Sequence, residues 1–357
     1  MSGREPAPEV LRRGYWRWLL LALALSVGAL VLLGVRAAGE VFLFWTRASG
    51  PGLGLAFTVV VLLWLVEAAR VQALVRTVGF SAPLRTLLVV NLAAAFVAAV
   101  TPASSGGPPA QVYFLSRLGL APEKAAAAVT GKLLLNLAFF AVLAPPLFIL
   151  YRQTLHLGAT VQVLAVVGAL GLTGIVMALF FLLLHSSLAE QLLVLLARTV
   201  LRLRPADRER EAEVLEIWRS RLEGFRCSLL ALLGTDWSLR LRLVLLTGAY
   251  WFGFFSLLPL LAYSLGLRIN FVTAVGRQFL YYFLVGYVPL PGASGAAELS
   301  LAALLSGLVP GPLVTGLIAA WRFFTYHVNL LVGAPLIWWC SRQMLSLASQ
   351  LRGGPLR

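Results

Sequence analysis

The chain has 357 residues, of which 60% are hydrophobic and 12% charged, and its formal net charge is +15. Soluble domains carry roughly 25% charged residues, so this composition excludes a water-soluble globular protein. The basic residues lie mainly at the ends of apolar runs and in one connector, which is the pattern of cytoplasmic loops in membrane proteins. We therefore expect a polytopic membrane protein with no nucleic-acid partner.

The first two apolar runs predict a pair of membrane spans. Trp18–Leu33 follows several arginines and has no small-residue cleavage site, so it is expected to leave the cytoplasm as a retained span. A short loop is expected between Arg36 and Arg47. Leu53–Ala69 then returns to a second group of arginines. The N-terminus is therefore predicted to be cytoplasmic.

The next apolar segment, Leu84–Leu115, is interrupted at Thr101–Pro109 by a run of Pro, Ser and Gly. Two further spans, one ending near Leu150 and one at about Thr160–Leu184, precede an arginine-rich connector, Ser187–Asp236. We expect this connector to be a cytoplasmic amphipathic helix on the membrane surface. Since two spans separate it from Leu84–Leu115, that segment must enter and leave on the same side. The sequence predicts a re-entrant hairpin with the interruption at its tip.

The second half repeats this arrangement in the opposite orientation. Leu241–Leu265 leaves the cytoplasm, Phe271–Leu308 is interrupted at Pro289–Gly295, and Pro312–Trp339 leads to a basic C-terminus that we place inside. The prediction is an all-α polytopic membrane protein with about six full spans and two re-entrant broken helical hairpins in an inverted repeat. Residues 1–357 form one transmembrane domain, with halves 53–184 and 241–340, re-entrant segments 84–115 and 271–308, and connector 187–236.

The two interruptions are the first indication of a binding site. Unwound backbone at membrane depth persists only against protein or a wet cavity. The start of a helix also offers unpaired N–H groups that suit a phosphate or carboxylate. Kinks packed by neighbouring helices are the alternative explanation.

Charged residues within apolar runs are the second indication, because such charges usually pair or face a functional cavity. Glu67, Arg70 and Lys132 are expected to extend toward the cytoplasmic interface instead. Glu298 and Arg322 are predicted to form an ion pair inside the protein, since apolar residues extend to both sides of Arg322.

Catalytic and metal sites are not predicted. The three histidines are far apart, and both aspartates lie in the connector, so neither zinc-type spacing nor an acidic Mg²⁺ site is visible. A phosphate-binding loop of the Walker type is also absent. We therefore expect no metal, no cofactor and no enzymatic activity.

Two motifs resemble signatures of the flippase-like family of the lysylphosphatidylglycerol synthase transmembrane domain. The first consists of Thr101-Pro102, Ser105–Gly107 and Pro109–Gln111, followed by Tyr113 and Ser116-Arg117. The second consists of Pro289–Gly295 with Glu298, then Arg322 and Tyr326. The resemblance covers the chain from the first span to about Trp339. It implies paired broken helices that move lipids between leaflets.

The chain departs from that family in two places. Many members carry an acidic residue near Pro108 and an arginine at the position of Gln111, and this sequence has neither. The synthase domain of two-domain members, which adds an aminoacyl group to phosphatidylglycerol, is not expected either. The lipid is therefore not carried over from the resemblance.

The sequence predicts a flippase-like transporter that moves a phosphate-bearing lipid between leaflets of the cytoplasmic membrane. The lipid is a phospholipid, an aminoacylated phospholipid or a polyprenyl-phosphate carrier, and the expected partner is a lipid with an anionic headgroup. An integral membrane enzyme on a lipid-linked substrate and a non-transporting scaffold for a lipid synthase are the alternatives. A homodimer, the direction and the energy source stay open. The residues expected at the substrate are Thr101, Ser104, Ser105, Gly106, Gly107, Gln111, Lys132, Arg277, Ser294, Gly295, Glu298, Arg322, Tyr326 and His327.

Overall fold

The computed structural model describes residues 35–101, 104–151, 208–285, 301–302, 305 and 307–337, together with residues 167, 168, 171, 174 and 178. Within this part of the chain the regular structure is helical, with no strand. The helices are α2 (Val35–Arg47), α3 (Gly50–Thr77), α4 (Leu84–Val100), α5 (Gly107–Arg117), α6 (Pro122–Tyr151), α9 (Arg208–Leu233), α10 (Trp237–Ser264), α11 (Phe271–Val285) and α13 (Gly311–Arg322), followed by a π-helical turn, η1 (Phe323–His327).

Three of these helices are long and apolar enough to cross a membrane: α3, the Pro122–Leu143 part of α6, and α10. The predicted spans Leu53–Ala69 and Leu241–Leu265 thus coincide with α3 and α10. The protein is a helical membrane protein. The predicted span Trp18–Leu33 and nearly all of Thr160–Leu184 lie outside the described residues, so the total number of spans stays a prediction.

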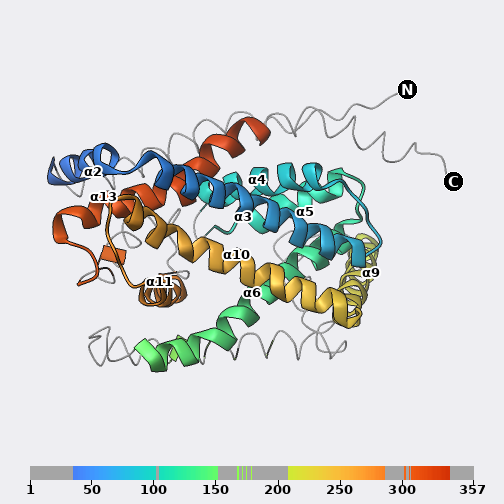
Figure 1. Cartoon of the computed structure of the whole chain (residues 1–357). Coiled ribbons are helices and arrows are strands. Elements are labelled where there is room, and N and C mark those ends of the chain that lie inside the picture. Colours follow the sequence, from blue (N-terminus) through green and yellow to red (C-terminus); the bar gives the residue numbers. More distant parts are fainter. Residues whose placement is uncertain are drawn as a thin grey trace.

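Helices α3 and α10 run antiparallel in close contact and form the centre of the fold (Figure 1). A Cβ on Gly52 would lie 2.5 Å from Ser264 Cβ, and one on Gly253 would lie 3.0 Å from a Leu63 methyl group. Glycine at these positions therefore lets the two backbones approach. Such small-residue seams are how helices pack where lipid removes the hydrophobic drive for association.

The predicted interruption of Leu84–Leu115 is confirmed as a break between two helices. α4 ends at Val100 and α5 begins at Gly107, and they pack side by side (Figure 1). A Cβ on Gly107 would lie 2.8 Å from Ala98 Cβ. α4 has 17 residues and is roughly 25 Å long, shorter than the roughly 30 Å hydrocarbon core. This length suits a re-entrant element, although entry from one membrane face stays a prediction.

The segment between Arg36 and Arg47 was predicted as a loop, and this prediction is wrong. It forms α2, which packs on α13 through a glycine contact. A Cβ on Gly316 would lie 2.5 Å from the carbonyl oxygen of Glu40. The charges at Arg36, Glu40 and Arg47 suggested a solvated connection, but Phe44 on the same helix is fully buried.

The helical connector prediction is confirmed for α9, which packs against α6. A Cβ on Gly224 would lie 3.0 Å from the Glu123 side chain, and one on Gly131 would lie 2.8 Å from a Leu232 methyl group. Residues 187–207 of the predicted connector lie outside the described residues. Its position on the membrane surface stays a prediction.

The last predicted span, Pro312–Trp339, is helical as far as residue 337 but is widened at η1. A helical stretch, residues 328–337, continues from this turn and packs on α4, where a Cβ on Gly333 would lie 2.7 Å from the carbonyl oxygen of Leu92. The predicted interruption at Pro289–Gly295 falls outside the described residues. The inverted repeat is therefore untested.

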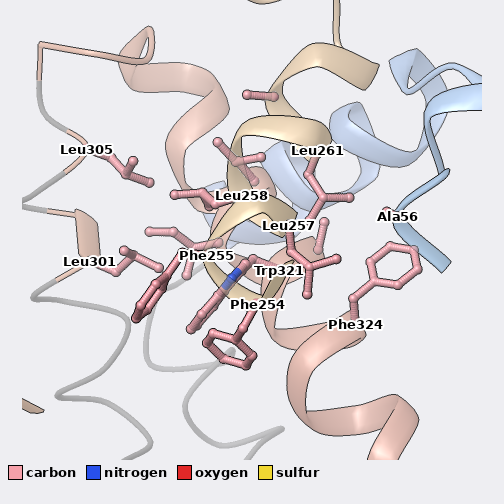
Figure 2. Packing of buried hydrophobic residues seen from close by; sticks show 14 of the residues in the cluster. Ala56, Phe254, Phe255, Leu257, Leu258, Leu261, Leu301, Leu305, Trp321 and Phe324 are labelled. Atoms are coloured by element: carbon pink, nitrogen blue, oxygen red, sulfur yellow. The ribbon is translucent and has the colours of Figure 1, made fainter. Parts of the chain in front are cut away.

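Two main apolar clusters hold the helices together. One lies between α3, α10 and α13 and includes Phe255, Leu258 and Trp321 (Figure 2). The other packs the second half of α3 against α4, α5, α6 and α9, with Leu74, Leu87 and Leu115 at its centre. A polar region lies beside these two clusters, and there the candidate site is found.

Candidate functional site

A cavity of about 650 Å³ lies between the helices and is called the central cavity below. Its wall is formed by α3, α4, α5, α6, α10, α11, α13, η1 and the break between α4 and α5. The volume falls in the range of roughly 300–1,000 Å³ that small-molecule sites occupy. Of the predicted site residues, seven line it: Ser104, Ser105, Gly107, Gln111, Lys132, Arg322 and Tyr326.

Three charged residues form a connected cluster, and two of them, Glu67 and Lys132, line one part of the wall. Arg70 Nη1 donates to Glu67 Oε2 at 2.7 Å, and Lys132 Nζ lies 2.9 Å from Glu67 Oε1. Arg70 is fully buried, whereas Glu67 and Lys132 are only 19% and 15% exposed. The prediction that these side chains extend to the cytoplasmic interface is wrong. They turn inward because each charge finds an opposite charge within the protein, which offsets part of the cost of desolvation.

Two amides extend this cluster toward the broken hairpin. Lys132 Nζ donates to Gln111 Oε1 at 2.7 Å, and Gln111 Nε2 donates to Asn91 Oδ1. A lysine ammonium has donors and no acceptor, so the atom that faces it must be the amide oxygen. The orientation of Gln111 therefore follows from Lys132, and that of Asn91 follows from Gln111.

A second branch connects the cluster to α6 and α10. Arg70 Nη2 donates to Asn136 Oδ1 at 2.7 Å, and the Trp251 indole donates to the same oxygen at 3.2 Å. The guanidinium carbon of Arg70 lies 5.5 Å from the centre of the Tyr250 ring, within cation–π range. The polar cluster thus joins α3, α4, α5, α6 and α10 through side chains alone.

The break between α4 and α5 is closed by its own residues. Thr101 Oγ1 accepts from the Gly106 amide at 2.9 Å and donates to the Val97 carbonyl at 2.9 Å. The Gly107 amide donates to Ser104 O, and Pro108 and Pro109 have no N–H group. The expectation that the first turn of α5 offers these amides to an anion is therefore wrong. At the first turn of α5, a phosphate would therefore be bound by side chains and not by backbone amides.

Ser104 and Ser105 lie on the cavity wall as predicted, within this closed turn. Ser104 has a φ of 55°, in the left-handed region that non-glycine residues seldom adopt. Such strain persists only where neighbouring contacts fix it. Thr101 and Gly106 provide those contacts, and both lie behind the wall instead of on it.

The π-helical turn η1 brings a second basic residue to the wall. The guanidinium carbon of Arg322 lies 5.1 Å from the centre of the Tyr326 ring, and the Tyr326 hydroxyl donates to the Ala99 carbonyl at 3.0 Å. His327 Nδ1 lies 3.3 Å from Arg322 O and is not a lining residue. π-helical turns are rare and frequently lie at functional sites.

The remaining predicted residues separate into two groups. Arg277 on α11 is half-buried, but it is not among the residues that line the central cavity. Ser294, Gly295 and Glu298 lie outside the described residues, so the predicted pairing of Glu298 with Arg322 stays a prediction. Among the described residues no group of three His, Cys, Asp or Glu side chains could hold a metal ion.

Comparison with known proteins identifies the family. Residues 19–333 match the family described as the lysylphosphatidylglycerol synthase TM region. The chain belongs to this family. A relative from Archaeoglobus fulgidus, described as a UPF0104 membrane protein, is 30% identical over 317 residues, which cover 86% of this chain and 94% of the relative. The resemblance inferred from the two sequence signatures is thereby confirmed.

In this member of the lysylphosphatidylglycerol synthase TM family, sequence reasoning missed several polar residues of the site. Asn91, Asn136 and Asn329 each lie inside an apolar helix and line the central cavity. Asn329 accepts a hydrogen bond from the Trp64 indole at 2.8 Å, and thereby joins the helical stretch after η1 to α3. An amide within a membrane helix is itself a signal, since such groups hydrogen-bond across helices.

Proposed function

We propose that this chain is a flippase-like transporter that moves a phosphate-bearing lipid between the leaflets of the cytoplasmic membrane. The observation that carries the proposal is the central cavity, bounded by membrane-length helices and lined by Glu67, Lys132 and Arg322. A charge at the bilayer centre costs about 2.5–3.5 kcal/mol on insertion scales. Three charges on one cavity wall indicate a site that receives water and a polar headgroup.

The cavity wall supports a division of the lipid between two environments. The headgroup would enter beside Lys132, Gln111 and the serines of the α4–α5 break, and Arg322 would add charge from η1. Aromatic residues such as Trp251 and Tyr282 line the wall between helices, where an amphipathic ligand can slide past. The acyl chains would stay in the surrounding lipid. Candidate substrates are phospholipids, aminoacylated phospholipids and polyprenyl-phosphate carriers.

Transport would follow from movement of one half of the protein against the other, as in carriers built from inverted repeats. The arginine distribution favours an orientation with both termini and the α9 connector on the cytoplasmic side. In that orientation the α4–α5 hairpin would enter from the cytoplasm. The break at Thr101 would then lie near the level of the cavity.

The test is a lipid translocation assay in proteoliposomes that contain labelled phosphatidylglycerol, with chemical quenching of the outer leaflet. Arg322→Ala is expected to lower the rate about tenfold, because a charge-assisted contact to the phosphate is lost. Arg268→Gln is the matched control, since Arg268 is exposed and does not line the cavity. An unchanged rate in Arg322→Ala would remove the role of this arginine. A wild-type rate equal to that of empty liposomes would refute transport.

The proposed transport leaves the lipid chemically unchanged, which distinguishes it from an enzymatic function. The rival function, chemistry on a lipid-linked substrate, requires a product. Incubating the purified protein with phosphatidylglycerol or a polyprenyl phosphate and analysing the lipids by mass spectrometry decides between them. Recovery of unchanged lipid alongside measurable translocation supports the transporter.

A further inference from the structure

Both carboxylate oxygens of Glu67 are already engaged by cations of the protein. Its Oε2 accepts from Arg70, and its Oε1 lies 2.9 Å from the ammonium of Lys132. Glu67 is the one carboxylate among the described residues that line the central cavity. A substrate ammonium group would therefore have to compete with two cations of the protein for the same carboxylate.

Hydrogen-bond donors are in surplus at the same place. Because Lys132 fixes the orientation of Gln111 and Gln111 fixes that of Asn91, the chain of bonds ends on an amide nitrogen. Asn91 is 8% exposed and lines the cavity, and its Nδ2 has no hydrogen-bond partner among the described residues. Arg70 Nε is also buried and has no hydrogen-bond partner among the described residues. A buried donor without a partner is costly, and a ligand oxygen reached by a small side-chain shift would remove that cost.

The charges agree with this surplus. Beside the cavity, Lys132 and Arg70 outnumber Glu67 in the charged cluster of the described residues, so the potential of this cluster is positive. The faces of Tyr250 and Tyr326 are each approached by an arginine of the protein. Each of these rings already makes a cation–π contact with an arginine, so neither is readily available for a cation–π contact with a substrate ammonium group.

We infer that the central cavity selects lipids whose headgroup is a net-negative phosphate ester without an ammonium group, and that Lys132 and Asn91 are its specificity-determining residues. The inference rests on the proposed function, since it names the substrate class of the same site. It favours phosphatidylglycerol-like and polyprenyl-phosphate headgroups and disfavours aminoacylated ones. Lysyl-phosphatidylglycerol carries more ammonium groups than phosphates, so the positive wall would repel it.

The first test is competition for the purified protein. The protein is incorporated into nanodiscs that contain equal amounts of phosphatidylglycerol, lysyl-phosphatidylglycerol and a polyprenyl phosphate. The lipid that stays bound to the released protein is then measured by native mass spectrometry. We expect the two anionic lipids to be retained at least about fivefold over the lysyl lipid. Equal or preferred retention of the lysyl lipid would overturn the inference. In a parallel arm, inorganic phosphate at millimolar concentration should leave the bound lipid in place; its full displacement would show that the site takes free phosphate.

The second test replaces one hydrogen-bond donor of the site with an acceptor. Asn91→Asp keeps the oxygen that accepts from Gln111 and replaces the unpaired amide nitrogen with a carboxylate oxygen. Retention of phosphatidylglycerol is expected to fall about tenfold, with a rise for the lysyl lipid. Lys132→Gln should lower phosphatidylglycerol retention in the same direction, and Lys132→Arg should restore most of it. Arg268→Gln is the charge-matched control and should leave the lipid ratio unchanged. An unchanged ratio in both Asn91→Asp and Lys132→Gln would refute the assignment.

Failure of the inference and failure of the proposed function give different results. Selective retention of phosphatidylglycerol without translocation would refute transport and leave the headgroup assignment intact. Translocation of the lysyl lipid at the rate of phosphatidylglycerol would refute the assignment and leave transport intact.

Discussion

Two helices that meet at the central cavity are interrupted in different ways. Between α4 and α5 the helix stops, and Thr101 supplies side-chain bonds that close the gap. At η1 the helix continues after Arg322, and for one turn it adopts the wider π-helical winding. The first interruption gives up backbone hydrogen bonds, which Thr101 partly replaces, and lies in a run of Pro, Gly and Ser, whereas the second needs no special residue. The two contact each other where Tyr326 donates to Ala99 O.

The largest effect is expected from filling the space at the α4–α5 break. A Cβ on Gly106 would lie 2.7 Å from Thr101 Cγ2 and 2.9 Å from Val97 Cγ1, so Gly106→Ala overpacks the turn. We expect a loss of about 1–3 kcal/mol in the free energy of unfolding. Gly54→Ala is the matched control, since nothing lies within 4 Å of its added methyl group. Unfolding of the purified protein in detergent measures both. Equal stabilities would show that the turn is loose.

A smaller effect is expected from separating the two interruptions. Tyr326→Phe removes the hydroxyl that donates to Ala99 O and keeps the ring beside Arg322. The expected loss is about 0.5–1.5 kcal/mol, the usual value of one neutral hydrogen bond. Tyr263→Phe is the control, because Tyr263 is exposed on α10. The measurement is again unfolding in detergent, and similar values for the two variants would mean that η1 is not tied to the break.

The smallest effect is expected at Cys227, a thiol on α9 far from both interruptions in the sequence. Its labelling by a maleimide can show from which side of the membrane the α4–α5 break is reached. Cys227 on the α9 connector donates to Glu223 Oε1 at 3.3 Å; this bond, together with desolvation and the carboxylate charge, raises the pKa of the Cys227 thiol. A raised pKa lowers the thiolate fraction at neutral pH, so labelling by a maleimide should be slow and should accelerate as the pH rises. In a Cys340→Ser background, Glu223→Gln is expected to speed labelling a few-fold at neutral pH.

The same cysteine reports topology. An impermeant maleimide should reach Cys227 in opened membranes and not in intact cells, since the connector is predicted to be cytoplasmic. Labelling in intact cells would invert the orientation and place entry of the α4–α5 hairpin on the outer side. Unchanged labelling rates in Glu223→Gln would show that the carboxylate does not control the thiol.

Much of the helical architecture could be predicted from the sequence. Long apolar runs bounded by arginine predicted α3 and α10, and the Pro/Ser/Gly run predicted the break after Val100. α2 could not be predicted in the same way, because its charges are typical of a loop and its burial comes from contact with Gly316 of α13. η1 has no composition signal, because a π-helical turn is set by packing and not by residue type.

The site was predicted less completely. Gln111, Lys132 and Arg322 were expected at the substrate and line the cavity, but the inward direction of Glu67 and Arg70 was missed. A helix such as α3 is apolar on nearly all sides, so its sequence does not show which face meets protein and which meets lipid. The role of Asn136 depends on Arg70 and Trp251, which are distant in sequence. Only the packing of α3, α6 and α10 brings the three together.

The two glycine contacts of the final membrane segment have a mechanical consequence. Gly316 seats one end against the backbone of α2, and Gly333 seats the other against the backbone of α4. Because both contacts are close, a distortion of the helix between them would be concentrated at η1, where the helical winding is already wider. Flexing of this segment would therefore displace Arg322, which directly precedes η1 and lines the cavity, while the two glycine contacts stay in place.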